Sequence, residues 1–338
     1  MDRQQGGGRT ISLPGGPRVL SWASVVGKKE GQGPLADFFD LVGEEDSFGE
    51  KSWEKAETAM QKKALSLALD KAGLAPGAVD CLLAGDLLNQ CIGSAFAARE
   101  HGRPFLGLYG ACSTMAESLA LAALLTGGGF LERAAAVTSS HFCSAERQYR
   151  TPLEYGGQRP PTAQWTVTGA GCALVGRGGE GPRITHVTLG RVVDLGVKDA
   201  NNMGAAMAPA AADTILSHLA GTGRKPSDYD LIVTGDLGSL GLELLGELLR
   251  EAGLELPGLA DCGALIYDRQ GQDVHCGGSG CGCSAAVLCG FLLGGLSGGK
   301  WRRLLFCGTG ALLSPTSTQQ GESIPGICHA VALEGGKT

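Results

Sequence analysis

An internal repeat is the feature of this 338-residue sequence that most restricts its fold. Residues 63–87 (KALSLALDKAGLAPGAVDCLLAGDL) match residues 213–237 (DTILSHLAGTGRKPSDYDLIVTGDL) at a constant offset of 150. Residues 110–140 match residues 280–310 at an offset of 170, through a small-residue turn, an apolar helix, a Gly-Gly break and an apolar strand. Because the order of these elements is the same in both copies, the sequence predicts two halves built on one plan.

Each half alternates predicted helices with apolar strands, which indicates an α/β fold. Strand runs such as LLAGD and LIVTGD are apolar throughout, as is typical of buried parallel strands. The run SLALAALL has no polar face, so a helix with this sequence must be covered on all sides. We therefore expect a flexible tail over 1–19, then two pseudo-symmetric halves over 20–178 and 182–334. Their sheets should be mainly parallel, with buried central helices that begin near Ser113 and Ser284.

The charge and the cysteine content exclude several classes of protein. The formal net charge is −6 and no basic cluster is present, so we expect no nucleic-acid partner. The longest apolar stretches fall short of the roughly 20 residues that a bilayer span needs, or are interrupted by glycine. Most of the 12 cysteines lie in apolar runs and no secretory leader is recognisable, which predicts a globular protein of a reducing compartment.

Cys112, in the stretch GACSTMAE, is the first candidate for chemistry. It lies at the start of the first apolar helix, where free N–H groups and the helix dipole favour a thiolate. Acyl transfer also needs a base or donor from the second half, normally histidine or asparagine. The corresponding turns read Gly235-Asp236-Leu237 and GGSGC at 277–281, without an imidazole. If Asp236 faces Cys112, its charge raises the thiol pKa, so we predict a pocket-lining thiol without a catalytic role.

Several other residues are candidates, each with a plain structural alternative. His141 follows the strand AAAVTSS, at the carboxyl end where α/β folds place their sites. Arg147 and Arg150 follow it and are either anion ligands or ordinary surface charges. His329, in the apolar run ICHAVALE, is equally well a hydrogen-bonded core histidine. We assign no metal, because the cysteines around the second buried helix lack the paired spacing of a metal site; they are Cys276, Cys281, Cys283 and Cys289.

The duplicated core, with the turn ACS opening a buried helix, resembles the thiolase fold shared by thiolases and ketoacyl-acyl carrier protein synthases. A set of strings resembles more closely the stage V sporulation protein AD family, the soluble member of the SpoVA group in spore-forming bacteria. These strings are GDLLNQ, GACSTMAES, TSSH, AERQYR, EYGGQ, MAPAAADTI, GGSGC and TGALLSPTS. The resemblance implies binding of dipicolinic acid (pyridine-2,6-dicarboxylate) during its uptake into the developing spore, on a disarmed thiolase scaffold that needs no coenzyme.

The resemblance also implies partners and a place in the cell. We expect a chain of the forespore or spore that associates peripherally with the inner spore membrane and with other SpoVA membrane proteins. It leaves open whether calcium accompanies the ligand and whether the chain forms a homodimer through a strand next to AAAVTSS. The ligand-binding residues that we expect are Cys112, Ser113, His141, Arg147, Asn89, Asp236, Ser279 and His329. The alternative is an active acyltransferase or synthase III-like condensing enzyme that uses Cys112, with His141, His275 or His329 as its base.

Overall fold

Two successive series of helices and strands build the protein, which the computed structural model describes over residues 8–149, 159–256 and 258–335. The first series contains β2 (Arg18–Val26), α1 (Trp53–Ala72), β4 (Cys81–Gly85), α2 (Ile92–His101), β5 (Phe105–Gly107), α3 (Thr114–Gly127), β6 (Arg133–Ser140) and β8 (Gly169–Gly176). The second contains β9 (Arg183–Thr188), α5 (Met203–Thr222), β10 (Leu231–Thr234), α6 (Gly238–Glu251), β11 (Leu259–Asp261), α8 (Cys281–Val287), α9 (Leu293–Ser297), β13 (Arg303–Ala311) and β14 (Gly326–Glu334). A π-helical turn, Leu288–Leu292, joins α8 to α9.

The strand order repeats with the sequence. The first half has the order β5-β4-β6-β8-β2 and the second the order β11-β10-β13-β14-β9, and the two groups meet through a single residue pair, Arg18 with Arg183. Within each group one strand, β8 or β14, runs against the other four. The prediction of a duplicated α/β fold with mainly parallel sheets is confirmed.

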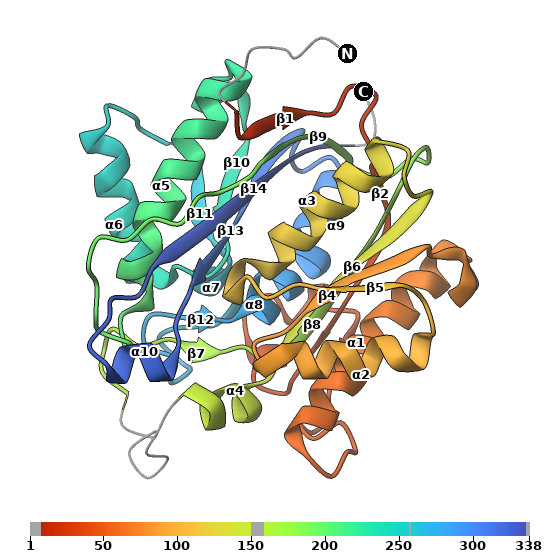
Figure 1. Cartoon of the computed structure of the whole chain (residues 1–338), viewed down its shortest axis with the longest axis horizontal. Coiled ribbons are helices and arrows are strands. Elements are labelled where there is room, and N and C mark those ends of the chain that lie inside the picture. Colours follow the sequence, from red (N-terminus) through yellow and green to blue (C-terminus); the bar gives the residue numbers. More distant parts are fainter. Residues whose placement is uncertain (1–7, 150–158, 257, 336–338) are drawn as a thin grey trace.

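The two apolar helices lie between the two groups of strands (Figure 1). Every residue of α8 is buried, and in α3 only Gly127 is exposed. α3 contacts β6 and β8 of its own half as well as β13 and β14 of the other. A close approach needs glycine at Gly171 of β8, because a Cβ atom there would lie 2.4 Å from the Ala285 carbonyl oxygen of α8. The prediction of buried central helices is therefore confirmed.

The outer helices also repeat. α1 and α2 cover the first group of strands, and α5 and α6 cover the second (Figure 1). α1 begins after Ser52 and α5 after Asn202, and each side chain accepts a hydrogen bond from a backbone N–H of the first turn. They end at Gly73 and Gly223, with φ of +62° and +66°, a left-handed conformation that favours glycine.

The remaining elements complete the structure. The remaining described strands and α-helices are β1 (Thr10–Ser12), β3 (Leu41–Val42), α4 (Phe142–Tyr149), β7 (Trp165–Thr166), α7 (Cys262–Ile266), β12 (Gly278–Ser279) and α10 (Pro315–Gln319). β1 pairs with β9, so part of the segment that we expected to be a flexible tail is a strand. β6 has a strand on each side, and the free edge of its half is β5. No helix of the described part is long and apolar enough to cross a bilayer.

Candidate functional site

Cys112 lies where the chain enters the buried helix α3. Residues Ala111–Ser113 form one turn of 3-10 helix directly before α3. Ala111 has φ +51°, a left-handed conformation that is strained for a residue with a side chain. Cys112 is buried, and it lines a cavity of about 260 Å³ that we call the Cys112 cavity.

The walls of the Cys112 cavity come from both halves of the molecule and are mostly apolar. The apolar lining residues are Leu87, Ala111, Ala145, Met203, Ala311, Leu312 and Leu313. Hydroxyl groups are contributed by Tyr109, Tyr149, Thr166 and Ser279. The hydroxyls of Tyr109 and Tyr149 lie 3.2 Å apart, and that of Tyr149 donates to the Leu87 carbonyl oxygen at 2.6 Å. Among the described lining residues there is no cation, so the cavity favours an uncharged, partly aromatic guest.

Asp236, which follows β10, lies directly behind the thiol. Its carboxylate accepts hydrogen bonds from the Thr309 hydroxyl (2.8 Å), the Ser279 hydroxyl (3.2 Å) and the Gly280 N–H (2.9 Å), and also from the Cys112 thiol. Burial first, and then the Asp236 carboxylate, raise the pKa of Cys112 well above its usual value. From the sequence we could say only that Asp236 would oppose thiolate formation if it faced Cys112, and the structure places it against this thiol.

His141 does not reach the Cys112 cavity, contrary to our expectation. It is fully buried, its Nε2 lies 2.8 Å from the Asp46 carbonyl oxygen, and its Nδ1 accepts from the Cys143 N–H at 3.1 Å. Because Nδ1 is an acceptor, the ring proton is on Nε2, and burial lowers the pKa of His141. Both nitrogens are therefore occupied, Nε2 with the loop between β3 and α1 and Nδ1 with the first turn of α4.

The other histidines considered as bases are also elsewhere. His329 accepts a hydrogen bond from the Gly190 N–H at Nδ1 (3.1 Å), and burial lowers its pKa to about 4. His275 lies 3.4 Å from the Asp273 carboxylate. Ser113, although next to Cys112, donates its hydroxyl to the Gly110 carbonyl oxygen at 2.7 Å and does not line the cavity. No described imidazole lines the Cys112 cavity, so this thiol has no histidine base within the part of the chain that the structure covers.

Arg147 and Asn89 share a shallow surface groove outside the Cys112 cavity. Arg147 is half exposed and forms an ion pair with Glu54, while the Asn89 N–H donates to the Gln148 side chain at 3.1 Å. The expected role of Arg147 as a cation of this cavity is wrong because of helical phase. Residues four apart, Ala145 and Tyr149, share the face of α4 that lines the cavity, and Arg147 between them points the other way. Arg150 lies outside the described residues.

Sequence reasoning thus found Cys112, Asp236 and Ser279 but missed most of the wall. The sequence does carry a signal for Tyr149. It lies in the string AERQYR, four residues after Ala145, so the two share one face of a helix. The sequence also carries a signal for Ala311, because the 170-residue offset of the repeat pairs it with His141. Of this pair, Ala311 lines the cavity. Met203 and Thr166 had no local signal, because they reach the cavity only through packing of distant segments.

Comparison with known proteins gives a family and a fold. The family model for stage V sporulation protein AD (SpoVAD) matches residues 7–334. Stage V sporulation protein AD of Bacillus subtilis (strain 168) is 47% identical over 317 residues, which cover 94% of each chain. Among solved structures, the tetronic acid condensing enzyme AbyA1 matches with a TM-score of 0.62 at 19% identity, covering 94% of this chain and all of that one. The 3-oxoacyl-[acyl-carrier-protein] synthase III of Aquifex aeolicus VF5 matches with a TM-score of 0.59 at 13% identity and the same coverage.

Proposed function

Because the chain belongs to the stage V sporulation protein AD family and has a thiolase-like fold, we propose that it binds dipicolinic acid in the Cys112 cavity and takes part in its uptake into the developing spore. It does so as a binding protein without turnover. One observation carries this proposal: a pocket lies at the nucleophile position of a condensing-enzyme fold, while its thiol faces a buried carboxylate and no described histidine.

The size of the Cys112 cavity supports an aromatic ligand. A cavity of about 150 Å³ holds benzene, and the larger Cys112 cavity leaves room for substituents on a ring. Apolar walls contact the ring faces, and the hydroxyls of Tyr109, Tyr149, Thr166 and Ser279 are available to carboxyl oxygens.

The charge of the cavity decides the form of the ligand. The dianion would enter a pocket that has no described cation on its walls and Asp236 behind them, and burying unpaired charge in this way is costly. A complex of one dipicolinate with one calcium ion carries no net charge, and calcium accepts carboxylate oxygens as ligands. We therefore propose that the neutral calcium complex is the cargo.

Isothermal titration tests this proposal. Dipicolinate should bind the protein more tightly in the presence of calcium than in the presence of a calcium chelator. Pyridine-2,4-dicarboxylate cannot hold calcium between two carboxylates and the ring nitrogen, so it should bind the protein much more weakly. Ala145→Phe should fill the cavity and weaken binding at least about tenfold, and Tyr149→Phe should weaken it about three- to tenfold. Arg147→Ala is the matched control on the same helix and should bind like the parent. Loss of binding in Arg147→Ala with retention in Ala145→Phe would place the site in the surface groove instead.

A second candidate, an acyltransferase or synthase III-like condensing enzyme, is favoured by one observation. The strained Ala111 presents Cys112 at a helix start, the position of a nucleophile. Incubation with acyl-coenzyme A followed by mass spectrometry separates the two functions. We expect no acyl adduct on Cys112 and no condensing turnover, and an unchanged fold in Cys112→Ala. A stable adduct that is lost in Cys112→Ala would establish the enzyme.

The proposal extends to partners. We propose that the chain acts at the inner spore membrane, bound peripherally to other SpoVA membrane proteins, and that it forms a homodimer. Support for this comes from family membership.

A further inference from the structure

A second cavity, of about 250 Å³, lies between α1 and α2 on the outer side of the first half, and we call it the His101 cavity. Most of its wall is apolar and comes from α1, α2, β4, β6 and the turn after α1; these residues are Leu65, Leu69, Leu74, Pro76, Leu82, Ala84, Ala97, Ala98 and Val137. It shares no lining residue with the Cys112 cavity. It is therefore a separate feature of the fold.

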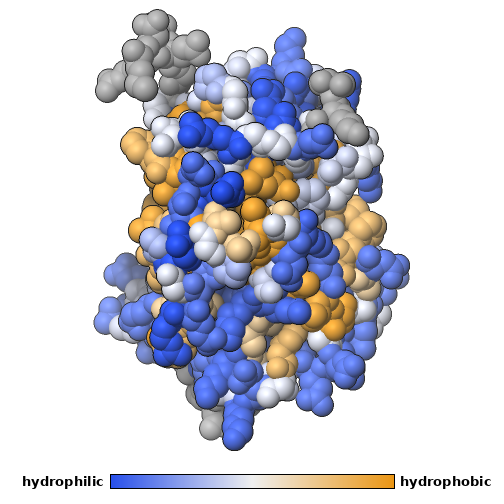
Figure 2. Space-filling model, turned by 90° about the vertical axis from the view of Figure 1, so that its right-hand side faces the viewer, coloured by the Kyte–Doolittle hydropathy of each residue, from blue (hydrophilic) through white to orange (hydrophobic). Residues whose placement is uncertain are grey.

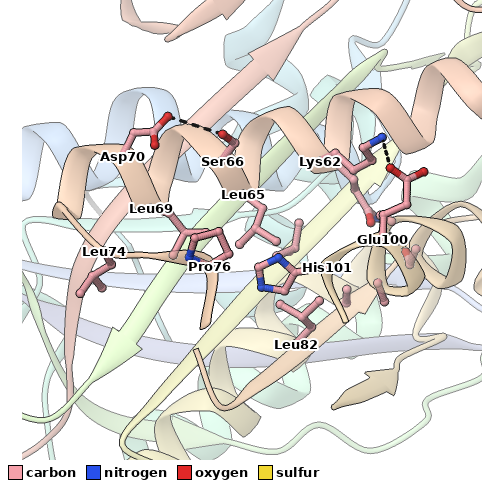
Figure 3. Close-up of a pocket in the computed structure, with 16 residues that line it drawn as sticks. Lys62, Leu65, Ser66, Leu69, Asp70, Leu74, Pro76, Leu82, Glu100 and His101 are labelled. Carbon is pink, nitrogen blue, oxygen red and sulfur yellow. Dashed lines mark hydrogen bonds and ion pairs between the residues drawn. The ribbon is translucent and has the colours of Figure 1, made fainter. Parts of the chain in front are cut away.

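His101, the last residue of α2, presents its imidazole to this cavity. Figure 3 shows the ring between Leu65, Leu82 and Pro76. Its Nε2 is buried and has no hydrogen-bond partner among the described residues. A buried polar nitrogen without a partner is costly, and a group that hydrogen-bonds to it recovers that cost.

The inner end of the His101 cavity is polar, and its charged lining residues are Lys62, Glu100 and Asp70. Gln61, which is buried, donates from Nε2 to the Gly85 carbonyl oxygen (3.1 Å) and to the Ser94 hydroxyl (2.7 Å), and no described residue donates to its Oε1. At the mouth, Lys62 and Glu100 neutralise each other in an ion pair (Figure 3). Burial, and then the nearby Arg103, lower the pKa of His101, so its ring is neutral.

We propose that the His101 cavity binds a small uncharged amphipathic molecule, with its apolar body against the leucines of α1 and a hydroxyl group at Nε2 of His101. A hydroxyl both donates and accepts, so it satisfies this nitrogen in either ring tautomer. Anionic ligands are disfavoured, because the carboxylate of Asp70 lines the cavity without a cationic partner among the described residues. The apolar surface between the two helices gains contacts when such a body fills it.

The test uses 4-bromophenol as the probe and bromobenzene as its partner without the hydroxyl. In crystals soaked with 4-bromophenol, the anomalous signal of bromine should lie between α1 and α2. In solution, titration followed by NMR should show saturable binding of 4-bromophenol that is about three- to tenfold tighter than that of bromobenzene. His101→Leu should remove this preference while keeping the apolar contribution.

A pair of substitutions on one helix locates the site in solution. Ala97→Phe fills the cavity and should weaken 4-bromophenol binding at least tenfold, while Ala95→Phe, two residues away on α2 and outside the lining, should leave it unchanged. If a variant fails to fold, the crystal and the bromobenzene comparison still decide. Bromine located elsewhere, binding only at soaking concentration, or equal binding by Ala97→Phe and the parent would each overturn the proposal.

Discussion

The repeated Gly-Asp-Leu motif places one aspartate after β4 and one after β10, and the two have different surroundings. Asp86 accepts hydrogen bonds from the Leu88 N–H (2.8 Å) and from the Ser94 N–H (2.7 Å) and hydroxyl (2.6 Å), which fixes the start of α2. Asp236 instead holds Ser279 and Gly280 against Cys112. The same local turn therefore supports a helix in one half and helps to raise the pKa of a thiol in the other, because different distant segments pack against it.

Removing the charge of Asp236 should make Cys112 more reactive. In Asp236→Asn the like charge is gone, so the thiol pKa falls and the thiolate fraction rises on the order of tenfold. Burial, the larger cause, remains, so Cys112 stays less reactive than a free cysteine. The rate of iodoacetamide alkylation at Cys112, followed by peptide mass spectrometry, measures this. Ser279→Ala keeps the carboxylate and should not accelerate alkylation, and equal rates in Asp236→Asn and the parent would contradict the prediction.

Glu57 gives the protein a pH dependence with a definite sign. Burial and the neighbouring Asp86 raise the pKa of Glu57 to about 8. Between the ordinary value, 4.5, and about 8 the folded protein keeps a proton that the unfolded chain releases. The stability that the bound proton of Glu57 contributes is complete below pH 4.5 and is lost as the pH rises towards about 8. The free energy of unfolding therefore falls with rising pH between these two values.

The substitution Glu57→Gln isolates this effect. The amide is neutral throughout, and the Ser144 hydroxyl, which donates to Glu57 at 2.8 Å, can turn to the His141 carbonyl oxygen at 3.1 Å. Between pH 5 and 8 the parent should lose on the order of 1 kcal/mol more stability than the variant. Urea unfolding at both pH values measures it, and equal losses in the two proteins would refute the assignment. Glu30 and Asp261, whose pKa values burial raises to about 7, are present in both.

At the scale of elements, the same devices recur in both halves. Asp80 accepts from the backbone N–H of Arg133 at 3.0 Å, and Asp230 accepts from that of Arg303 at 2.9 Å. Each carboxylate thus fixes the strand that follows a central helix, β6 or β13. These contacts lie at the offsets of the sequence repeat, so the duplication extends to hydrogen bonds.

Glycine at the contact of β8 with α8 should be essential for stability. Gly171→Ala would place a methyl group 2.4 Å from the Ala285 carbonyl oxygen, and overpacking of this kind costs about 1–3 kcal/mol. Gly294→Ala in α9 is the control, because nothing lies within 4 Å of its Cβ position. That change should be neutral or stabilising by up to about 1 kcal/mol. Thermal unfolding of the two variants checks the contrast, and a Gly171→Ala protein as stable as the parent would contradict the close approach.

At the scale of the whole molecule, the edge strand β5 is the place where we propose that two copies pair. β5 ends the sheet of the first half, and Leu106 on it is 48% exposed. Figure 2 shows apolar patches separated by polar residues on the face at the right of Figure 1. An exposed strand edge with apolar side chains is suited to pairing with another chain.

A charge on that edge should separate the copies. We expect the parent to elute as a dimer in light-scattering chromatography and Leu106→Lys to elute as a monomer. Leu195→Lys, at a residue that is 68% exposed in the loop before α5, is the control and should remain a dimer. A monomeric parent protein at micromolar concentration, or a dimeric Leu106→Lys protein, would remove β5 as the interface.

The sequence by itself determined the duplicated fold. Each copy contains the same order of apolar runs, and a constant offset relates the two copies. It also identified Cys112 and Asp236, since both lie in turns whose position the repeat defines. Tertiary structure alone decided which side chains line the Cys112 cavity. Tyr149 enters and Arg147 does not because they lie two residues apart on α4 and so face opposite sides of the helix, and Met203 arrives from a segment far along the chain. His141 is excluded because packing gives both of its nitrogens backbone partners, and no local pattern encodes such long-range contacts.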